Sequence, residues 1–476
     1  MTALDIIEQK QPIKHKLFKN VYAVGELDNT QKSVINASEE CSMVAVTGCF
    51  GTGKSHVITN LASHYLVNGK KVLIVAKNDN ALGVIYDRLV EIGGDYVAMR
   101  CGNRDKQVDL ALKLSNLVSN QVNFSHEYAS KLSYWLAKDK KQECKKVLYS
   151  SRMNALEQVI ATHRQDLVVL TKSLLSSKKK TRKEIMQKYF NTLLDVMPCW
   201  LCTVMDISDN MPLIEGMFDL VIFDESSELN IPQSLPCLYR AKKAVIVGDD
   251  KQLKHISFLE GKKEQSLMTK HGISQDLQLI YSHRKNSLFD FAQYYCDKHI
   301  LLDMNYRSPR NMVQFNINEF YNGAIKCNKG DDKDCIKKVL LNGKVDENGV
   351  NMVEAEYIVR MIRQYINKGK TIGVLSPFTR QCKAIEKLIK DNFTIEEIIN
   401  NGILIGTSFA WQGNQRDIVF NSFCVADNSP RQSFTFIDRA DNFNVLTSRA
   451  IEKMINIYST KNIKSDLMRR YLEYIK

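Results

Sequence analysis

The feature that most restricts the fold of this chain is the stretch Gly48–Ser55, which matches the pattern G-x-x-x-x-G-K-S at every fixed position. The apolar run 43–46 precedes it and residues 56–62, with helical spacing, follow it, so it is expected to join a strand to a helix. Glycines let backbone N–H groups surround phosphates, a lysine neutralises their charge and a serine hydroxyl can bind Mg²⁺. The sequence therefore predicts a nucleoside triphosphate site at a helix N-terminus. The residues expected to line it are Gly48, Gly51, Thr52, Gly53, Lys54, Ser55 and His56.

Length and composition are those of a globular protein. The 476 residues predict two or three domains, and a hydrophobic fraction of 44% is enough for packed cores. No run of about 18 apolar residues predicts a membrane span, and mixed charge follows residues 1–4 where a signal peptide would have its apolar core. We therefore expect a soluble, cytoplasmic protein without a membrane partner.

The twelve cysteines are scattered without the spacing of a disulfide framework, which suits reduced thiols. One pair, Cys199 and Cys202, has the spacing of metal or redox ligands, but no second pair of cysteines or histidines accompanies it. Buried structural thiols are the favoured interpretation of this pair, and a zinc or redox site is the alternative.

The charge of the chain favours a polyanionic partner. The formal net charge is +13 and the isoelectric point is near 9.0. Lysines and arginines that neutralise phosphates supply most non-specific affinity for nucleic acid. Charge alone also fits a solvated lysine-rich face, so the partner must be argued from the motifs.

Short β-branched runs alternate with helical patterns along most of the chain, which is typical of an α/β fold with parallel sheets and crossover helices. The alternation stops between residues 103 and 196, where leucines at helical spacing predict a helical insertion. Its basic run, Lys178–Lys183, either contacts nucleic acid or is a solvated helix connection, and the second interpretation is favoured. The expected strands are 72–75, 220–223, 244–247, 372–375, 403–405, 418–420 and 454–458. The leucines are Leu110, Leu112, Leu114, Leu117, Leu167, Leu170, Leu174 and Leu175.

A second chemical signal follows the apolar run 218–223, where Asp224 and Glu225 stand side by side. In this place Asp224 is expected to hold Mg²⁺, with Ser55 as a second ligand, and Glu225 to orient and deprotonate the attacking water. On its own, a pair of carboxylates after a strand usually belongs to a surface turn. In this chain the phosphate loop upstream favours the catalytic interpretation instead. After another strand, Gln252 is expected to sense the γ-phosphate, and a polar turn is the alternative.

Eight further segments occur in an order that is specific to one family, although no single one of them is specific. The set resembles the superfamily 1 helicases, in the branch (superfamily 1B) that contains the nonsense-mediated-decay helicase and its bacterial relatives. The segments are 27–31 (LDNTQ), 76–81 (AKNDNA), 224–228 (DESSE), 248–253 (GDDKQL), 302–308 (LDMNYRS), 373–381 (GVLSPFTRQ), 411–417 (WQGNQRD) and 443–450 (FNVLTSRA).

The resemblance implies two RecA-like domains of the phosphate-loop NTPase type, with ATP between them and single-stranded nucleic acid across their tops. It implies ATP and Mg²⁺ as cofactors. The bounds expected are 1–26 for an N-terminal segment, 27–102 and 197–300 for the first domain, 103–196 for its helical insertion and 301–476 for the second domain.

The resemblance also assigns roles to single residues. Gln31 is expected to read adenine, and Arg307 and Arg449 are expected to reach the γ-phosphate as arginine fingers. The expected catalytic set is Lys54, Asp224, Glu225, Gln252, Arg307 and Arg449. The expected contacts to nucleic acid, mostly through phosphates, are Lys77, Asn78, Thr203, Thr407, Ser408 and Gln412.

The expected activity is ATP-dependent helicase action on single-stranded DNA or RNA, moving 5′ to 3′ as in this branch. A translocase that remodels nucleoproteins without separating strands is the alternative, and a nucleotide-gated binding module is disfavoured because it needs no Glu225. Three residues depart from the family pattern: Glu228 (usually Gln), Gln415 (usually Glu) and Ser448 (usually Thr). Since Gln415 removes a charge from the motif that joins nucleotide and strand, a weakened motor is conceivable. The sequence leaves open whether DNA or RNA is the substrate.

Overall fold

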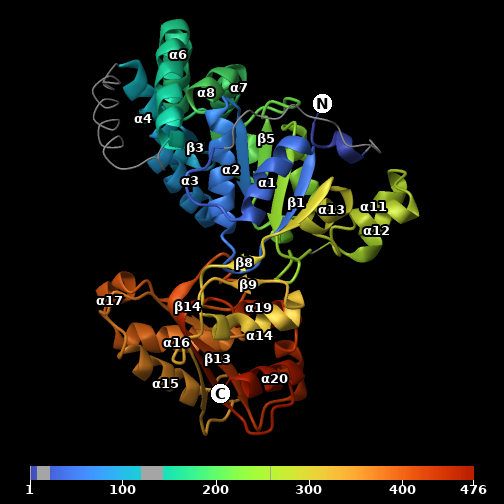
Figure 1. The fold of residues 1–476 in the computed structure, drawn as a ribbon, viewed down its shortest axis with the longest axis vertical. Helices are drawn as coiled ribbons and strands as arrows, with labels where there is room; N and C mark the ends of the chain where they lie inside the picture. Colours follow the sequence, from blue (N-terminus) through green and yellow to red (C-terminus); the bar gives the residue numbers. More distant parts are fainter. Residues whose placement is uncertain (1, 8–21, 120–142, 258, 476) are drawn as a thin grey trace. The chain divides into compact units, whose positions relative to one another are not determined.

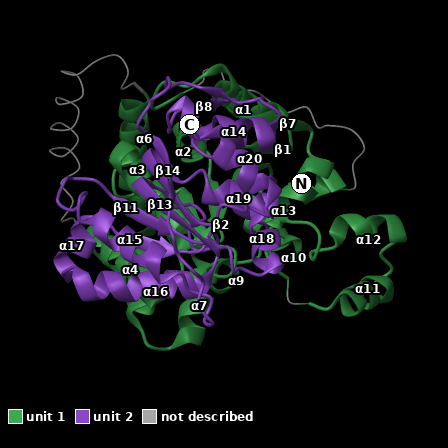
Figure 2. Cartoon of the chain, turned by 90° about the horizontal axis from the view of Figure 1, so that it is seen from below, with its two compact units in different colours: residues 1–48, 54–249, 255–302 green, residues 49–53, 250–254, 303–476 purple. Residues whose placement is uncertain are grey.

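The computed structural model describes residues 2–7, 22–119, 143–257 and 259–475, which form two compact units (Figures 1 and 2). The first unit comprises Met1–Gly48, Lys54–Asp249 and His255–Leu302. The second comprises Cys49–Gly53, Asp250–Lys254 and Asp303–Lys476. The chain thus enters the second unit in two short segments before residue 303.

The first unit is built on a seven-stranded sheet in the order β3-β4-β2-β5-β6-β1-β7. All of its strand pairs are parallel, as the alternating pattern predicts. Buried apolar residues form most of these strands, because a parallel sheet is covered on both faces. The strands are β1 Met43–Thr47, β2 Val72–Ala76, β3 Ala98–Arg100, β4 Cys199–Thr203, β5 Leu220–Phe223, β6 Ala244–Gly248 and β7 Lys298–Leu301.

Helices cover both faces of this sheet. Successive residues of β2 alternate between two cores: Val72 and Ile74 pack with α1, α2 and α3, whereas Leu73 and Val75 pack on the opposite face with α8, α10 and α13. The helices are α1 Asn29–Glu40, α2 Lys54–Val67, α3 Asp79–Gly93, α4 Arg104–Val118, α6 Glu143–Leu175, α7 Lys179–Lys188, α8 Phe190–Val196, α9 Ile207–Asn210, α10 Ile231–Tyr239, α11 Gly261–Lys270, α12 Gln275–Tyr281 and α13 Leu288–Tyr295, with the 3-10 turns η1 Asp5–Ile7 and η3 Ser226–Glu228.

In its described residues the segment between β3 and β4 is helical and contains α4, α6, α7 and α8 (Figure 1). Most of the leucines that predict these helices are buried, but Leu112 and Leu175 are 55% and 51% exposed. Arg152 of α6 is buried and donates to the backbone oxygens of Asp195 (2.8 Å) and Val196 (2.6 Å), at the end of α8. Part of the insertion, residues 120–142, lies outside the described residues, and its bounds stay a prediction.

The second unit carries a five-stranded parallel sheet in the order β10-β14-β13-β11-β12 and a separate parallel pair, β8 and β9. Two parallel sheets therefore confirm the expected α/β class. The strands are β8 Met304–Asn305, β9 Lys326–Cys327, β10 Ile336–Leu340, β11 Ile372–Leu375, β12 Leu404–Gly406, β13 Arg416–Ala426 and β14 Ala450–Ser459. The helices are α14 Arg310–Tyr321, α15 Met352–Ile362, α16 Thr379–Asn392, α17 Ile395–Asn400, α18 Arg431–Ile437, α19 Ala440–Leu446 and α20 Asp466–Tyr474.

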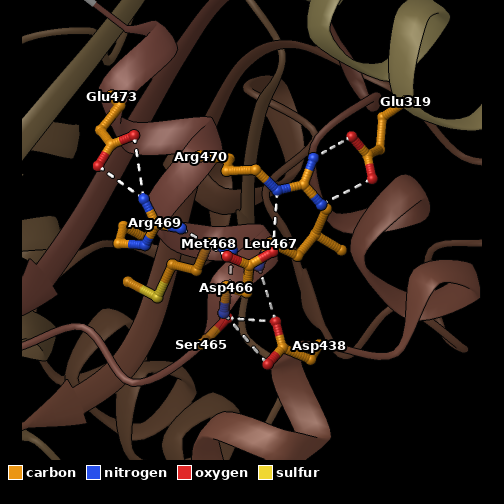
Figure 3. Close-up of polar contacts among 9 residues, drawn as sticks. All are labelled: Glu319, Asp438, Ser465, Asp466, Leu467, Met468, Arg469, Arg470 and Glu473. Carbon is orange, nitrogen blue, oxygen red and sulfur yellow. Dashed lines mark hydrogen bonds and ion pairs between the residues drawn. The ribbon is translucent and has the colours of Figure 1, made fainter.

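The C-terminal helix α20 is fixed to the second unit by polar contacts of its first turn (Figure 3). Its N-cap, Ser465, donates from Oγ to Asp438 Oδ1 at 2.6 Å, and the same carboxylate accepts the backbone N–H of Leu467 at 3.0 Å. Arg470 donates two hydrogen bonds to the carboxylate of Glu319 on α14. Asp438 thereby accepts the N–H groups of Asp466 and Leu467, and Ser465 Oγ accepts that of Met468, so that N–H groups of the first turn, which have no acceptor within the helix, are satisfied.

All twelve cysteines are free thiols. Cys199 and Cys202 are buried in β4, and burial raises the pKa of both thiols. Among the described residues no group of three or more Cys, His, Asp or Glu is arranged to hold a metal ion. Burial in a strand and a raised pKa are typical of structural thiols. A membrane-spanning helix is also absent from the described part of the chain, because no helix there is long and apolar enough.

Candidate functional site

The phosphate loop leaves the carboxyl end of β1, and Lys54 is the first residue of α2. Gly51 and Gly53 have φ of +72° and +80°, a region that favours glycine. Lys54 Nζ donates to the backbone oxygen of Gly48 at 3.0 Å. A Cβ at Gly48 would lie 2.5 Å from Lys54 Cγ. The loop therefore needs glycine at position 48 to give the lysine side chain its room.

The middle of the loop, Cys49–Gly53, groups with the second unit. Within that unit Asn305 Nδ2 donates to the backbone oxygen of Phe50, and the N–H of Tyr306 donates to the backbone oxygen of Gly51, both at 2.8 Å. The segment that ends in Tyr306-Arg307 is thus hydrogen-bonded to the phosphate loop.

Asp224 and Glu225 follow β5, as expected, and lie near the loop lysine. Glu225 Oε1 lies 3.4 Å from Lys54 Nζ, and Asp224 Oδ1 accepts the N–H of Glu225 at 2.9 Å. Asp224 is only 4% exposed. Burial and, second, the charge of Glu225 raise the pKa of the Asp224 carboxyl to about 7, while Lys54 opposes this rise. A cation beside Asp224 would therefore relieve an unfavourable buried charge.

The residues present fit a Mg²⁺ ion. Mg²⁺ prefers oxygen ligands and is usually held by one or two carboxylates together with substrate phosphates and waters. Asp224 supplies a buried carboxylate at the end of β5, and Ser55 supplies a hydroxyl in the first turn of α2. No larger ligand cluster is needed for such a site.

The other residues expected to bind the nucleotide lie in, or just before, the first turns of two helices. Gln31 is 3% exposed in the first turn of α1, and its Oε1 accepts the N–H of Asp28 in a capping box. Thr52 Oγ1 donates to the backbone oxygen of Cys49 at 2.9 Å. His56, in the first turn of α2, has Nε2 3.1 Å from the backbone oxygen of Glu26.

One face of α2 binds the segment 22–26, which leads to Gln31. The side chains involved stand four residues apart on the helix, and they bind the backbone of alternate residues of the segment. His64 Nδ1 accepts the N–H of Tyr22 at 3.1 Å, Asn60 Oδ1 accepts the N–H of Val24 at 2.7 Å, and His56 binds Glu26 as above. The segment is thus tied to the helix of the phosphate loop.

The carboxyl ends of β2 and β4 carry three of the residues expected to contact nucleic acid. Lys77 and Asn78 follow β2 and are exposed, and Thr203 ends β4. Thr203 Oγ1 donates to Asp206 Oδ2 at 2.7 Å. Since β2 lies between β4 and β5, these residues share the carboxyl edge of the sheet with Asp224.

In the second unit, Arg449 Nη2 donates to Gln252 Oε1 at 2.5 Å. The two residues are 4% and 5% exposed. Arg307 Nη1 donates to the backbone oxygen of Ser448 at 3.3 Å. The two expected arginine fingers and the expected γ-phosphate sensor therefore belong to neighbouring segments of one unit.

The remaining expected nucleic-acid contacts lie after β12. Ser408 is fully buried, and its Oγ donates to the backbone oxygen of Asn442 at 3.4 Å. Gln412 Nε2 donates to the backbone oxygen of Leu253 at 3.0 Å. Thr407 is partly exposed and turns the chain, since its backbone oxygen accepts the N–H groups of residues 410 and 411. Of these three side chains, those of Thr407 and Gln412 are partly exposed and accessible to a strand, whereas that of Ser408 is buried.

The basic run of the insertion forms the start of α7. Lys179 and Lys183 pair with Asp209 at 3.2 and 3.5 Å, and Lys180 is 91% exposed. This run lines a cavity of about 260 Å³ with Arg104. Two of its lysines therefore share one carboxylate within the unit, which agrees with the interpretation as a helix connection.

Two residues that make contacts in the site are absent from the set expected from the sequence. Asn305 is one, although its place directly before Tyr306-Arg307 could have indicated a role. Asn444 is another: its Nδ2 donates to the backbone oxygen of Lys251 and to Tyr321 Oη, both at 2.9 Å. Their contacts join segments that are far apart in sequence, so spacing alone could not reveal them.

Comparisons with known proteins show which family the chain is similar to. Two family models, each described as an AAA domain, match residues 26–257 and 284–461. The uncharacterized ATP-dependent helicase MG140 of Mycoplasma genitalium is 26% identical over 395 residues, which are 76% of this chain and 34% of that protein. The uncharacterized ATP-dependent helicase MJ0104 of Methanocaldococcus jannaschii is 21% identical, over 99% of this chain and 73% of that protein. The regulator of nonsense transcripts 1 homolog of Drosophila melanogaster is 23% identical, over 66% of this chain and 27% of that protein.

The chain belongs to the superfamily 1 helicases. Its branch is the one that contains the nonsense-mediated-decay helicase. This superfamily 1 helicase chain spans about a third of the length of MG140 and of the homolog of MG140 in Mycoplasma pneumoniae.

The three departures from the helicase pattern have distinct surroundings. Glu228 is buried and its Oε2 lies 3.4 Å from Lys77 Nζ. Gln415 is exposed just before β13. Ser448 is buried, and its Oγ donates to the backbone oxygen of Asn444 at 2.5 Å. Only the departure at Glu228 adds a charge next to a residue expected to bind a strand.

Proposed function

We propose that this chain hydrolyses ATP and uses the energy to move along single-stranded nucleic acid, 5′ to 3′, and to separate strands. The observation that carries the proposal is the geometry around Lys54, whose Nζ lies 3.0 Å from the Gly48 oxygen and 3.4 Å from Glu225 Oε1. A phosphate-binding lysine beside a carboxylate, with the buried Asp224 next to it, supports hydrolysis and not binding alone. ATP use and twelve free thiols support a cytoplasmic location.

In the proposed reaction each group has one task. Lys54 and the backbone N–H groups of the loop bind the β- and γ-phosphates. Ser55 and Asp224 would hold Mg²⁺, which when bound would supply Lewis-acid charge to the phosphate oxygens. Glu225 orients a water and accepts its proton, because it is the carboxylate that is not committed to the metal.

The arginines of the second unit complete the proposed set. Arg307 and Arg449 would stabilise the charge that develops on the transferred phosphoryl group, as arginine fingers do. Gln252, bonded to Arg449, would report whether the γ-phosphate is present. These roles rest on the family pattern and on the hydrogen bonds within the unit.

The strand is expected to be held through its phosphates, at Lys77, Asn78 and Thr203 in the first unit and Thr407 and Gln412 in the second. The net charge of +13 supports such binding. Affinity should then depend steeply on salt and little on base sequence. DNA and RNA are both compatible with phosphate contacts.

A translocase that does not separate strands is the second candidate. The observation that favours it is Gln415, which is exposed and uncharged where relatives in the family carry a carboxylate. Loss of that charge would weaken the coupling between ATP turnover and strand movement without removing hydrolysis.

A strand-displacement assay separates these candidates. The substrates are labelled duplexes with a single-stranded tail, as DNA and as RNA, with the tail at either the 5′ or the 3′ end, and phosphate release is measured in parallel. We expect ATP-dependent displacement of 5′-tailed substrates and none by Lys54→Ala. Phosphate release that single strands stimulate, without displacement of any duplex, would favour the translocase, and no ATP turnover on any substrate would contradict both.

A further inference from the structure

The turn that follows β5 carries a carboxylate at each end, and each carboxylate pairs with a different lysine. Glu225 lies 3.4 Å from Lys54, which follows β1, and Glu228 lies 3.4 Å from Lys77, which follows β2. The catalytic turn therefore contacts both the phosphate loop and the loop that is expected to hold the strand.

This turn is a short, well-connected piece of backbone. The N–H of Glu228 donates to the backbone oxygen of Glu225 at 2.9 Å, and Ser226 Oγ donates to the backbone oxygen of Val247 at 2.7 Å. Glu225 has φ +48° and ψ +43°, which a non-glycine residue adopts at a cost. Glu228 and Glu225 are therefore joined by three residue steps of backbone and by a direct hydrogen bond.

Lys77 and Glu228 differ in exposure. The Glu228 side chain is 4% exposed, whereas the Lys77 side chain is 46% exposed. A buried carboxylate needs a partner for its charge. Lys77 can serve as that partner from the surface, and its exposed ammonium can equally serve a phosphate of a bound strand. The carboxylate and the strand thus compete for one ammonium group.

We propose that Glu228 is a positioning residue that holds Lys77 until a strand phosphate displaces it, and that this displacement transmits strand binding to the catalytic turn. The inference rests on the proposed function. In this chain the neutral glutamine that is usual in the family is replaced by a carboxylate, so Lys77 would bind strands less tightly than it otherwise could. Release of Glu228 on strand binding would shift the turn that bears Glu225.

The test is a double-mutant cycle on strand binding. Binding of a labelled 20-nucleotide dT or U strand is measured by fluorescence anisotropy, without nucleotide, at several salt concentrations, for the wild type, Glu228→Gln, Lys77→Ala and the double variant. Glu452→Gln is the matched control, because Glu452 pairs with Lys370 at 2.5 Å outside the motifs. Thermal unfolding verifies that each variant is folded.

We expect Glu228→Gln to bind about two- to fivefold more tightly, because the Lys77 ammonium is half exposed and its interactions are weakened by solvent. We also expect the log–log salt slope to steepen by about 0.7, the value for one added phosphate contact on a single strand. Lys77→Ala should weaken binding and flatten the slope. In the Lys77→Ala background Glu228→Gln should have no effect, and the stimulation of ATP turnover by strands should fall in Glu228→Gln.

Additive effects of the two substitutions, or unchanged affinity in Glu228→Gln, would overturn the inference. If the wild type binds strands and hydrolyses ATP in that case, the proposed function stands and only the role of Glu228 fails. A wild type that neither binds strands nor hydrolyses ATP overturns both.

Discussion

Arg449 donates a hydrogen bond from Nη2 to Oε1 of Gln252 at 2.5 Å, across 197 positions of the chain. Both side chains are almost completely buried. The pair joins the segment after β6 to the segment before β14, and both residues were expected in the catalytic set from the sequence. A guanidinium that is held in place by a partner loses less freedom when it binds a phosphate.

Replacement of either arginine should lower ATP turnover much more than ATP affinity. For Arg449→Ala and Arg307→Ala we expect roughly 10³-fold lower kcat, the scale of an arginine finger. Steady-state phosphate release and a fluorescent-nucleotide titration measure the two quantities. Arg439→Ala is the control, because Arg439 pairs with Asp441 on the surface. Near-normal kcat for Arg449→Ala would contradict the role.

Substitutions at Lys54 and at Glu225 should impair different steps of ATP hydrolysis. Lys54→Ala removes the charge that neutralises the phosphates, so ATP binding and hydrolysis should both be lost. Glu225→Gln keeps the shape but cannot accept a proton, so ATP should bind while turnover falls to a small fraction of normal. Isothermal titration with ATP and a phosphate-release assay test this. Lost binding in Glu225→Gln together with surviving hydrolysis in Lys54→Ala would show that the roles are wrong.

The contact between His64 and the segment before Gln31 should weaken in mild acid. His64 Nδ1 accepts the N–H of Tyr22, and Nε2 lies 2.6 Å from Glu39 Oε1, so the neutral ring carries its proton on Nε2. Burial lowers the pKa of His64 below its ordinary 6.5, although Glu39 opposes this. The folded state therefore prefers the neutral ring, and its contribution to stability is present above pH 6.5 and is lost as pH falls below that value.

Thermal unfolding of the wild type and of His64→Gln between pH 7.5 and about pH 5.5 tests this sign, because the window spans the ordinary histidine pKa. The unfolding temperature of the wild type should fall more steeply with acid than that of the variant. The control is His271→Gln, since His271 is exposed after α11. If the unfolding temperature depends equally on pH in the wild type and in His64→Gln, His64 does not cause the loss of stability in acid.

The N-cap of α20 should make a measurable contribution to the free energy of unfolding of the second unit. Ser465→Ala removes the N-cap and its bond to Asp438, so we expect a loss of about 0.5–2 kcal/mol in the free energy of unfolding. Glu473→Ala removes an exposed ion pair with Arg469 and should cost about 0–1 kcal/mol. Urea unfolding compares the two variants. A larger loss for Glu473→Ala than for Ser465→Ala would contradict the cap.

Sequence patterns predict the parts of this fold that are set locally. The expected strands, the loop 48–55 and the pair Asp224-Glu225 all lie at their predicted positions. The strands are runs of buried apolar residues, and the loop and the pair each follow such a strand directly. Three strands of the first sheet are not predicted by the sequence pattern. β3 has only three residues, β4 lacks β-branched residues until its last position, and β7 is an edge strand with exposed Lys298 and His299.

Contacts between distant segments could not be predicted from spacing. The pair Glu228 and Lys77 depends on the sheet order that puts β2 next to β5. The bonds of Asn305 to the phosphate loop and of Asn444 to Lys251 depend on where the chain enters the second unit. Sequence gives the residue types of the site, and tertiary packing decides which of them touch.

The most direct test of the account is ATP turnover of this chain with and without single strands. Phosphate release is measured with Mg²⁺ and saturating ATP, with no nucleic acid, with single-stranded DNA, with single-stranded RNA and with blunt duplex, for the wild type and Lys54→Ala. We predict that single strands raise turnover of the wild type, that blunt duplex does so much less, and that Lys54→Ala shows none. Turnover that is the same with every nucleic acid and without one would contradict a strand-driven motor.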